Sequence, residues 1–285
     1  MKGYVKNLLL KFLKFSVICK LIIKIYPLAT EIYYLGTYRS THSQNTWITR
    51  YRNLQNLLEI SHLSPSNYKR YGNSQDGGYY LVDIVNSNCK LLSLGIGSDV
   101  TFEAELGKIV KEVHLYDHTV DGLPQDVQNS FFFQKKISSV DFQNEISLNT
   151  CFTNLDDQSG QTLLKVDIEG DELTIFDTLN ENFLFKTSQI VIEIHNLKFL
   201  MKDTYYSKLV NLLVTLSKFH TPVYINANNW DSYDLILNKP LPNTLEITYL
   251  HNNVKANYKF YPRFASPTEY PNTNLKPSIE MSFLI

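Results

Sequence analysis

The stretch "LLKVDIEGDE" (residues 163–172) places four acidic residues directly after an apolar run. Leu163, Leu164 and Val166 predict a buried strand, and Gly170 ends it, so the acids lie where a strand leaves the core and a helix begins. These acids are Asp167, Glu169, Asp171 and Glu172. Because a carboxylate is costly to bury, their concentration here indicates either a helix terminus or a binding site.

A helix terminus explains the last two acids of this stretch. Asp171 and Glu172 fit the first turn of a helix over residues 172–179, where the positive end of the helix dipole stabilises an acid by roughly 0.3–1 kcal/mol. Asp167 is different, because it occupies the carboxyl end of the strand, where open α/β sheets bind their ligands. Glu169 is expected to support such a site or to cap the helix. Asp167 is therefore the first candidate functional residue.

The composition indicates a globular protein with no general affinity for nucleic acid. With 285 residues and 44% apolar content, the chain can bury the core of one large domain, with or without an extension. Lys plus Arg (27) nearly balances Asp plus Glu (28), giving a net charge of -1, so no nucleic-acid partner is expected. Cys19, Cys89 and Cys151 form no C-x-x-C pair, which fits neither a disulfide framework nor a zinc site. Because this cysteine usage fits a reducing compartment, we expect a cytoplasmic protein.

The first 28 residues are apolar and basic. Lysines interrupt the apolar run well before the roughly 20 residues that a membrane span requires. A signal-peptide core and a small-residue cleavage site are also missing. We expect residues 1–28 to form a helix that packs on its own domain or on a second copy of the chain. Contact with anionic lipid at the inner face of a membrane is the open alternative.

The rest of the chain divides into a helical part and a part in which strands and helices alternate. Residues 46–63 show a second helical pattern, so the sequence predicts a helical extension over residues 1–63 and a main domain over residues 64–285. The alternation in the main domain predicts an α/β fold with a doubly wound, mostly parallel, Rossmann-like sheet. The expected strands cover residues 79–84, 90–95, 112–117, 131–137, 163–168, 189–195, 222–228, 244–250 and 279–285. The expected helices cover residues 101–111, 172–179 and 205–219.

The segment "LLSLGIGSDVTFEAEL" (residues 91–106) predicts a strand, a glycine turn and a helix. Gly95 and Gly97 let the backbone approach a ligand closely, and Asp117 ends the next strand, where an acid can accept hydrogen bonds from ribose hydroxyls. A dinucleotide fingerprint requires a glycine three residues after Gly97, and the chain has Val100. This departure favours S-adenosylmethionine, which has no pyrophosphate, over NAD.

The order of these motifs resembles the FkbM-type family of S-adenosylmethionine-dependent methyltransferases, particularly bacterial members associated with surface glycans. The resemblance extends over about residues 70–285. It implies a class I methyltransferase fold with Gly95 and Gly97 around the methionine part of the cofactor and Asp117 on the ribose. The segments that carry it are "RYGNSQDGGYYLVD" (70–83), "LGIGSDVTFE" (94–103), "VHLYDHTVDGLP" (113–124), "LLKVDIEGDE", "IVIEIHNL" (190–197), "INANNW" (225–230) and "LPNTLEITYL" (241–250).

Four further residues are candidates for binding the cofactor or the acceptor. Asp76 precedes two glycines in a turn-forming sequence, so a turn alone explains it. The resemblance implies that Asp76 also lies near the cofactor or the acceptor. His118 follows Asp117 and is expected to touch the cofactor. Asn228 and Asn229 are expected to form hydrogen bonds with a sugar.

The resemblance breaks at one point in the segment that precedes this Asn-Asn pair. Related chains often carry histidines there, whereas this chain has Tyr224 and Asn226. If those histidines bind a metal or an acceptor in relatives, this protein lacks the metal or takes a different acceptor.

Asp167, Glu193 and His195 are the candidate catalytic residues. Glu193 and His195 end another strand and point to one side of it, so the sequence predicts that all three converge at one sheet edge. We expect His195 to act as a general base that is oriented by a carboxylate and takes the proton of the acceptor hydroxyl. The alternative, which we do not favour, is that the three residues hold Mg²⁺ or another divalent cation.

The sequence therefore predicts an S-adenosylmethionine-dependent O-methyltransferase that acts on a hydroxyl of a sugar or glycan intermediate. One alternative is a non-catalytic scaffold that binds the cofactor or glycan enzymes through the N-terminal helices. Another is an NAD-dependent oxidoreductase or epimerase, against which Val100 and the lack of a Tyr-x-x-x-Lys pair both argue.

Overall fold

The computed structural model describes residues 44–236, 239–260 and 271–279. The described residues from residue 50 onward belong to one compact unit. The helix predicted for residues 1–28, with its membrane or subunit contact, lies outside the described residues, as does nearly all of the strand predicted for residues 279–285. The division of the chain at residues 63 and 64 stays a prediction.

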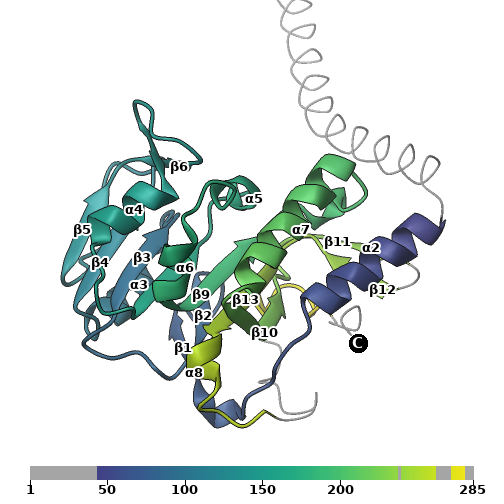
Figure 1. The fold of residues 1–285 in the computed structure, drawn as a ribbon, viewed down its shortest axis with the longest axis horizontal. Coiled ribbons are helices and arrows are strands. Elements are labelled where there is room, and N and C mark those ends of the chain that lie inside the picture. The colour runs from purple at the N-terminus through teal and green to yellow at the C-terminus, as the bar shows by residue number, and fades with distance from the viewer. Residues whose placement is uncertain (1–43, 237–238, 261–270, 280–285) are drawn as a thin grey trace, which may run out of the picture. The chain divides into compact units, whose positions relative to one another are not determined.

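A seven-stranded sheet is the centre of the fold (Figure 1). Its order is β10-β13-β9-β8-β3-β4-β5, and β13 is the one strand antiparallel to its neighbours. The doubly wound, mostly parallel sheet predicted from the sequence is confirmed. The strands are β3 (Lys90–Leu94), β4 (Glu112–Tyr116), β5 (Ser130–Phe133), β8 (Thr162–Val166), β9 (Thr187–Ile194), β10 (His220–Ala227) and β13 (Leu245–His251).

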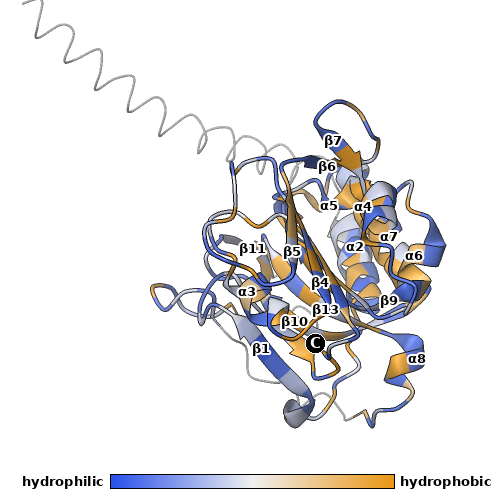
Figure 2. Ribbon diagram, turned by 90° about the vertical axis from the view of Figure 1, so that its left-hand side faces the viewer, coloured by the Kyte–Doolittle hydropathy of each residue, from blue (hydrophilic) through white to orange (hydrophobic). Residues whose placement is uncertain are grey.

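Helices cover both faces of this sheet. Figure 2 shows α4, α5, α6 and α7 on one side and α3 on the other. Within the described residues, no helix combines the length and the apolar character needed to cross a membrane. The helices are α2 (Gln44–Leu57), α3 (Thr101–Gly107), α4 (Leu148–Leu155), α5 (Glu172–Ile175), α6 (Glu181–Lys186), α7 (Asp203–Ser217) and α8 (Asn252–Lys255).

The core is formed by strands that are buried on both faces. Every residue of β8, β9 and β13 is buried, as expected for strands covered on both faces. Lys165 in β8, Glu193 in β9 and Glu246 in β13 are charged exceptions inside these strands. Since a buried charge is costly without a partner, these three residues indicate a candidate functional site at one end of the sheet.

Three two-stranded sheets accompany the central one. The hairpin of β1 (Tyr68–Gly72) and β2 (Gly78–Val82) confirms the turn expected at the Asp-Gly-Gly sequence. The other two pairs are β6 (Lys136–Ser138) with β7 (Glu145–Ser147), and β11 (Tyr233–Ile236) with β12 (Lys239–Pro242). The strand predicted over residues 131–137 is in fact two separate strands, β5 and β6.

Candidate active site

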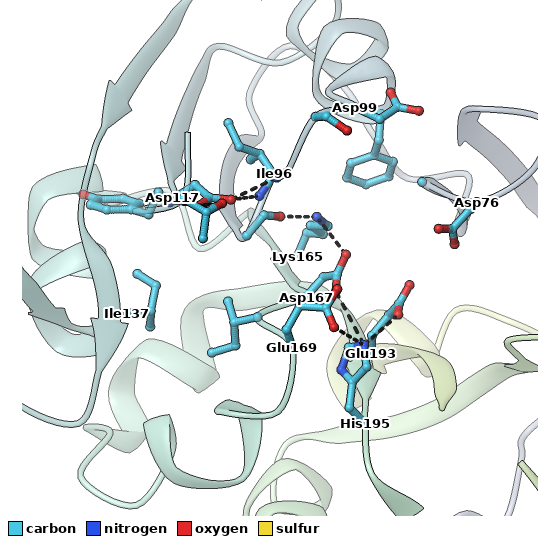
Figure 3. A pocket seen from close by; sticks show the side chains of 18 of the residues that line it. Asp76, Ile96, Asp99, Asp117, Ile137, Lys165, Asp167, Glu169, Glu193 and His195 are labelled. Carbon is cyan, nitrogen blue, oxygen red and sulfur yellow. Dashed lines mark hydrogen bonds and ion pairs between the residues drawn. The ribbon is translucent and has the colours of Figure 1, made fainter. Parts of the chain in front are cut away.

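A cavity of about 800 Å³ opens at the carboxyl ends of β3, β4, β8 and β9 (Figure 3). This edge of the sheet is where the sequence places its candidate residues, and the cavity brings nearly all of them together. The predicted residues that line it are Asp76, Gly95, Gly97, Asp117, His118, Asp167, Glu193, His195 and Asn228.

Asn229 does not line the cavity. Its side-chain amide nitrogen donates to the backbone carbonyls of Thr273, Lys276 and Pro277, and its oxygen accepts from the Thr273 N–H. The side chain is buried by these contacts. The structure therefore gives Asn229 the role of fixing the chain segment around residues 273–277, in place of the expected contact with a sugar.

The glycine turn, residues 95–97, contains two glycines that serve different purposes. A Cβ on Gly95 would lie 1.7 Å from the Asp167 carbonyl oxygen, so glycine is needed there for β3 and β8 to approach each other. A Cβ on Gly97 would meet nothing within 4 Å, because this residue faces open space in the cavity. Both have positive φ, 76° and 51°. Gly95 thus shapes the sheet edge, while Gly97 keeps room for a ligand.

Asp117 holds the glycine turn in place. Its Oδ2 accepts hydrogen bonds from the backbone N–H groups of Ile96 and Gly97, both at 2.9 Å, and its Oδ1 accepts from the N–H and hydroxyl of Thr119, both at 2.7 Å. Burial alone would raise the pKa of Asp117, but these hydrogen bonds outweigh it and lower the pKa below its usual value. Asp117 lies where a ribose-binding acid is expected, and its contacts within the chain show that it also fixes the backbone of the turn.

Lys165 connects the glycine turn to the predicted catalytic residues. Its ammonium donates to the Gly95 carbonyl oxygen and lies 3.5 Å from Asp167 Oδ2 and 3.8 Å from Glu103 Oε1. Burial would lower the pKa of this buried lysine, but the charges of Asp167 and Glu103 raise it overall. Lys165 therefore remains a cation in the lining of the cavity.

Asp167, Glu193 and His195 converge as the sequence predicts (Figure 3). The Nε2 atom of His195 lies 3.4 Å from Glu193 Oε2 and 3.9 Å from Asp167 Oδ1. The hydroxyl of Tyr79 is within hydrogen-bond distance of the other oxygen of each acid, 3.0 Å from Asp167 Oδ2 and 3.1 Å from Glu193 Oε1. We call Asp167, Glu169, Glu172, Glu193 and His195 the acidic cluster.

Glu172 orients the imidazole ring of His195. Its Oε1 lies 2.8 Å from His195 Nδ1 and also accepts from the Gly170 N–H. Burial would lower the pKa of His195, but the hydrogen bonds and charges of Glu172 and Glu193 raise it to about 11. In the absence of another cation the ring therefore carries a proton at neutral pH. An imidazolium cannot accept a proton, so His195 would act as a general base only after losing this proton, and that role stays a prediction.

Glu193 faces a second buried carboxylate across the sheet. It is paired with Glu246 in the antiparallel register of β9 and β13, and both are buried. Burial is the main cause that raises the pKa of Glu193 to about 8 and that of Glu246 to about 7. Asp76, in the β1–β2 turn, forms a group of three with these two acids. This end of the cavity is therefore strongly acidic.

Glu169 is the exposed member of the acidic cluster. Its side chain is 87% exposed, against 24% for Asp167, and its Oε2 lies 3.6 Å from His195 Nε2. Among the described residues it accepts no hydrogen bond, so its carboxylate is free to meet a ligand. Its backbone has a φ of 57°, a conformation that is uncommon for a residue with a side chain and is often found at functional sites.

Asn226, which precedes the Asn-Asn pair, supports the acidic end of the cavity. It is buried, and its amide nitrogen donates to Glu246 Oε2 and to Asn272 Oδ1, both at 3.0 Å. Tyr224 is also buried in the core. Neither residue is among the cavity-lining residues.

Sequence reasoning missed several residues of this site. Lys165 appeared only as part of an apolar run, although a lysine inside a buried strand is itself a signal. Glu172 lies in the first helical turn as expected, but its carboxylate is fully buried against His195 and does not simply face the helix dipole in solvent. Glu246 and Tyr79 gave no signal, because their contacts depend on strand register.

Residues 65–219 match the Methyltransferase FkbM domain family, which is more than half of the chain. The chain belongs to this family. It is accordingly an S-adenosylmethionine-dependent methyltransferase, and the FkbM resemblance predicted from the sequence is confirmed. No curated protein matches the chain.

Solved structures of methyltransferases resemble this FkbM methyltransferase only distantly. An rRNA methylase from Streptococcus thermophilus is 11% identical, with a TM-score of 0.36, and the match covers 59% of this chain and 90% of that one. A putative S-adenosylmethionine-dependent methyltransferase from Listeria monocytogenes is 11% identical, with a TM-score of 0.37 and coverages of 59% and 91%. These similarities say nothing about the substrate of the present chain.

Proposed function

We propose that this FkbM methyltransferase transfers a methyl group to a hydroxyl of a sugar or glycan intermediate. The observation that carries the proposal is the composition of the cavity. It combines a glycine turn, an acidic cluster and an exposed aromatic ring, Trp230. The scaffold alternative would gain support if the predicted catalytic residues lay apart, but Asp167, Glu193 and His195 converge.

The glycine turn fits S-adenosylmethionine. Gly97 faces open space, the backbone of Ile96 and Gly97 is fixed by Asp117, and His118 lies exposed at the same end of the cavity. These residues would hold the cofactor, whose sulfonium supplies an electrophilic methyl group. The apolar side chains of Ile96 and Ile137 also line the cavity and suit the flat face of an adenine ring.

The acceptor side of the cavity suits a sugar. Trp230 lines it with 56% of its surface exposed, and an aromatic face attracts the weakly positive C–H face of a pyranose ring. The backbone N–H of Trp230 donates to Asn228 Oδ1 at 2.9 Å, and the Lys276 ammonium donates to the backbone carbonyl oxygen of Trp230. These two hydrogen bonds fix the backbone at Trp230. Asp76 and Asn228 lie in the same cavity and offer partners for sugar hydroxyls.

Glu169 is the proton acceptor in this proposal. Methyl transfer is an in-line displacement, and the acceptor hydroxyl must lose its proton as it attacks. Tyr79 engages Asp167 and Glu193, and His195 engages Glu172, whereas the Glu169 carboxylate accepts no hydrogen bond among the described residues. Partial burial at the cavity, together with the charges of Asp167 and Glu172, raises the pKa of Glu169, which makes it a better base. Its exposed side chain can then release the proton to solvent.

The test is methyl transfer from labelled S-adenosylmethionine to a panel of free sugars, nucleotide sugars and non-sugar alcohols. We expect label in one or more sugars, and Trp230→Ala should raise the acceptor KM about 10-fold without changing affinity for S-adenosylhomocysteine. Tyr233→Ala is the matched control, because Tyr233 is 54% exposed on the neighbouring strand β11 and does not line the cavity. Exclusive labelling of non-sugar alcohols, or equal KM values for the two variants, would contradict the proposal.

A further inference from the structure

Asp167, Glu193 and His195 offer three donor atoms at separations that suit one metal ion. The donor atoms all lie within 4.8 Å of one another. His195 Nε2 is 3.9 Å from Asp167 Oδ1 and 3.4 Å from Glu193 Oε2. Ligands bound to one ion at about 2.0–2.2 Å lie roughly 3 Å apart, so small side-chain rotations bring these atoms to ligand distance.

The imidazole ring of His195 is held in the orientation that a metal ligand needs. Its Nδ1 contacts the carboxylate of Glu172 at 2.8 Å, so its Nε2 faces Asp167 and Glu193. Histidines that bind metals commonly use their second nitrogen in this way, which fixes the tautomer and the ring direction. Glu172 is completely buried, and its carboxylate accepts a hydrogen bond from the Gly170 N–H. Glu172 therefore fixes the orientation of the His195 ring from the side opposite the two acids.

The charge of the surrounding side chains also calls for a cation. Glu193 belongs to a second group of three with Asp76 and Glu246, and it faces Glu246 directly across β9 and β13. When both carboxylates are ionised, like charges at such opposed positions destabilise a sheet. Lys165 reaches only Asp167 among these acids, and it is shared with Gly95 and Glu103. We propose that Asp167, Glu193 and His195 bind one divalent cation of the Mg²⁺ or Mn²⁺ class.

The donor set indicates the class of ion and its use. Carboxylate ligands suit Mg²⁺ and Mn²⁺, and an imidazole is also accepted by Mn²⁺ and later transition metals. Within the proposed function, on which this role rests, the ion binds the acceptor hydroxyl and lowers its pKa. The hydroxyl proton passes to Glu169, the oxygen–methyl bond forms, and the methyl–sulfur bond breaks with its electron pair staying on sulfur. Binding of the ion itself does not depend on turnover.

The experiment measures Mn²⁺ binding to the purified full chain, freed of metal by EDTA and saturated with S-adenosylhomocysteine. Electron paramagnetic resonance counts free Mn²⁺, and Mg²⁺ is added as a competitor. We expect one ion per chain, displaced by Mg²⁺. Asp167→Asn should weaken Mn²⁺ binding more than 100-fold. Glu172→Gln should weaken it by about 10–100-fold, because the imidazole ring of His195 is then less firmly oriented. Asp171→Asn removes a half-exposed acid that lines the same cavity, and we expect less than a threefold change.

Affinity for S-adenosylhomocysteine and the melting temperature are measured on each variant, so that a loss of folding is recognised. If Asp167→Asn does not fold, Glu172→Gln still decides the question. No binding at millimolar Mn²⁺, or equal binding by Asp167→Asn and Asp171→Asn, would overturn the inference. Full methyl transfer in EDTA would also overturn it while leaving the proposed function intact. Metal binding without any S-adenosylhomocysteine binding would instead contradict the proposed function.

Discussion

The glycine turn and the acidic cluster line the same cavity, but the pKa values of the carboxylates at the two places are shifted in opposite directions. Asp117, which holds the glycine turn, accepts four hydrogen bonds from backbone and hydroxyl groups, which lower its pKa. Glu193 in the second region is buried near Asp167 and Glu246, which raises its pKa to about 8. The hydrogen bonds of the first region are thus complete within its own chain, whereas we propose that a cation completes the second.

From this difference we expect the glycine turn to bind the cofactor and the acidic cluster to carry out the reaction. A rigid turn with open space at Gly97 can hold a cofactor without rearrangement. A cluster of acids that lacks sufficient positive charge costs stability, and such costs are retained at sites that carry out reactions. Each of the following substitutions acts on one region and should leave the other unchanged.

The largest effect is expected from Asp167→Asn. The substitution keeps the size of the side chain but removes a negative charge from the acidic cluster, where we propose that the acceptor and an ion bind. We expect turnover to fall by about 10²–10³-fold or more, as when one preorganised group of an active site is removed. Affinity for S-adenosylhomocysteine should stay within threefold of the original chain. Steady-state kinetics and calorimetry measure the two quantities, and a loss of both would show that the two regions are not separable.

Alanine at the two glycines should affect stability to different extents. Gly95→Ala places a Cβ 1.7 Å from the Asp167 carbonyl oxygen and should cost about 3 kcal/mol or more in the free energy of unfolding. Gly97→Ala meets no atom within 4 Å, so it should cost only about 1–2 kcal/mol from its positive φ. Urea denaturation measures both variants. Equal losses would contradict the separate roles given to the two glycines.

Asp117→Asn should weaken the glycine turn in a pH-dependent manner. Its folded pKa is below the unfolded value, so the carboxylate contributes stability above the unfolded pKa and loses it as the pH falls through the folded one. At pH 7 we expect a loss of about 1–3 kcal/mol in the free energy of unfolding. The difference between variant and original chain should shrink in acid. A difference that does not change with pH would show that the hydrogen bonds do not depend on the charge.

Glu193→Gln should have the opposite sign in metal-free protein. The folded pKa of Glu193, about 8, is above the unfolded value, so stability falls as the pH rises from about 4.5 to about 8. The amide cannot ionise, and we expect the variant to melt higher than the original chain at pH 8, by about 2–4 °C per kcal/mol. Melting curves in EDTA at pH 5 and pH 8 test this. A variant that is less stable at pH 8 than at pH 5, relative to the original chain, would contradict the account of Glu193.

Local patterns in the sequence were sufficient to predict most of the central sheet. Buried parallel strands have nearly continuous apolar runs, so β3, β4, β8 and β9 could be recognised individually. The short helices α4 and α6 were not predicted, because six to eight residues give too little periodicity. The predicted helix over residues 172–179 is only the short α5, since tertiary contacts and not helical propensity place Glu172.

The site was predicted where its residues end strands and missed where they depend on register. Asp167, Glu193 and His195 follow directly from the rule that ligands bind at the carboxyl ends of parallel strands. Glu246 approaches Glu193 because β13 inserts antiparallel beside β9, and no local pattern specifies that pairing. Asn228 and Asn229 are adjacent in sequence, yet alternate directions along the chain put only Asn228 into the cavity.

One calorimetric experiment tests the central claim, that the glycine turn binds the cofactor and the acidic cluster performs the reaction. S-adenosylhomocysteine is titrated into the original chain, Gly97→Asp and Asp167→Asn, with NAD titrated into the original chain as a second ligand. We predict micromolar binding of S-adenosylhomocysteine to the original chain and to Asp167→Asn, none to folded Gly97→Asp, and no binding of NAD. Binding to Gly97→Asp as tight as to the original chain, or binding of NAD alone, would contradict the account.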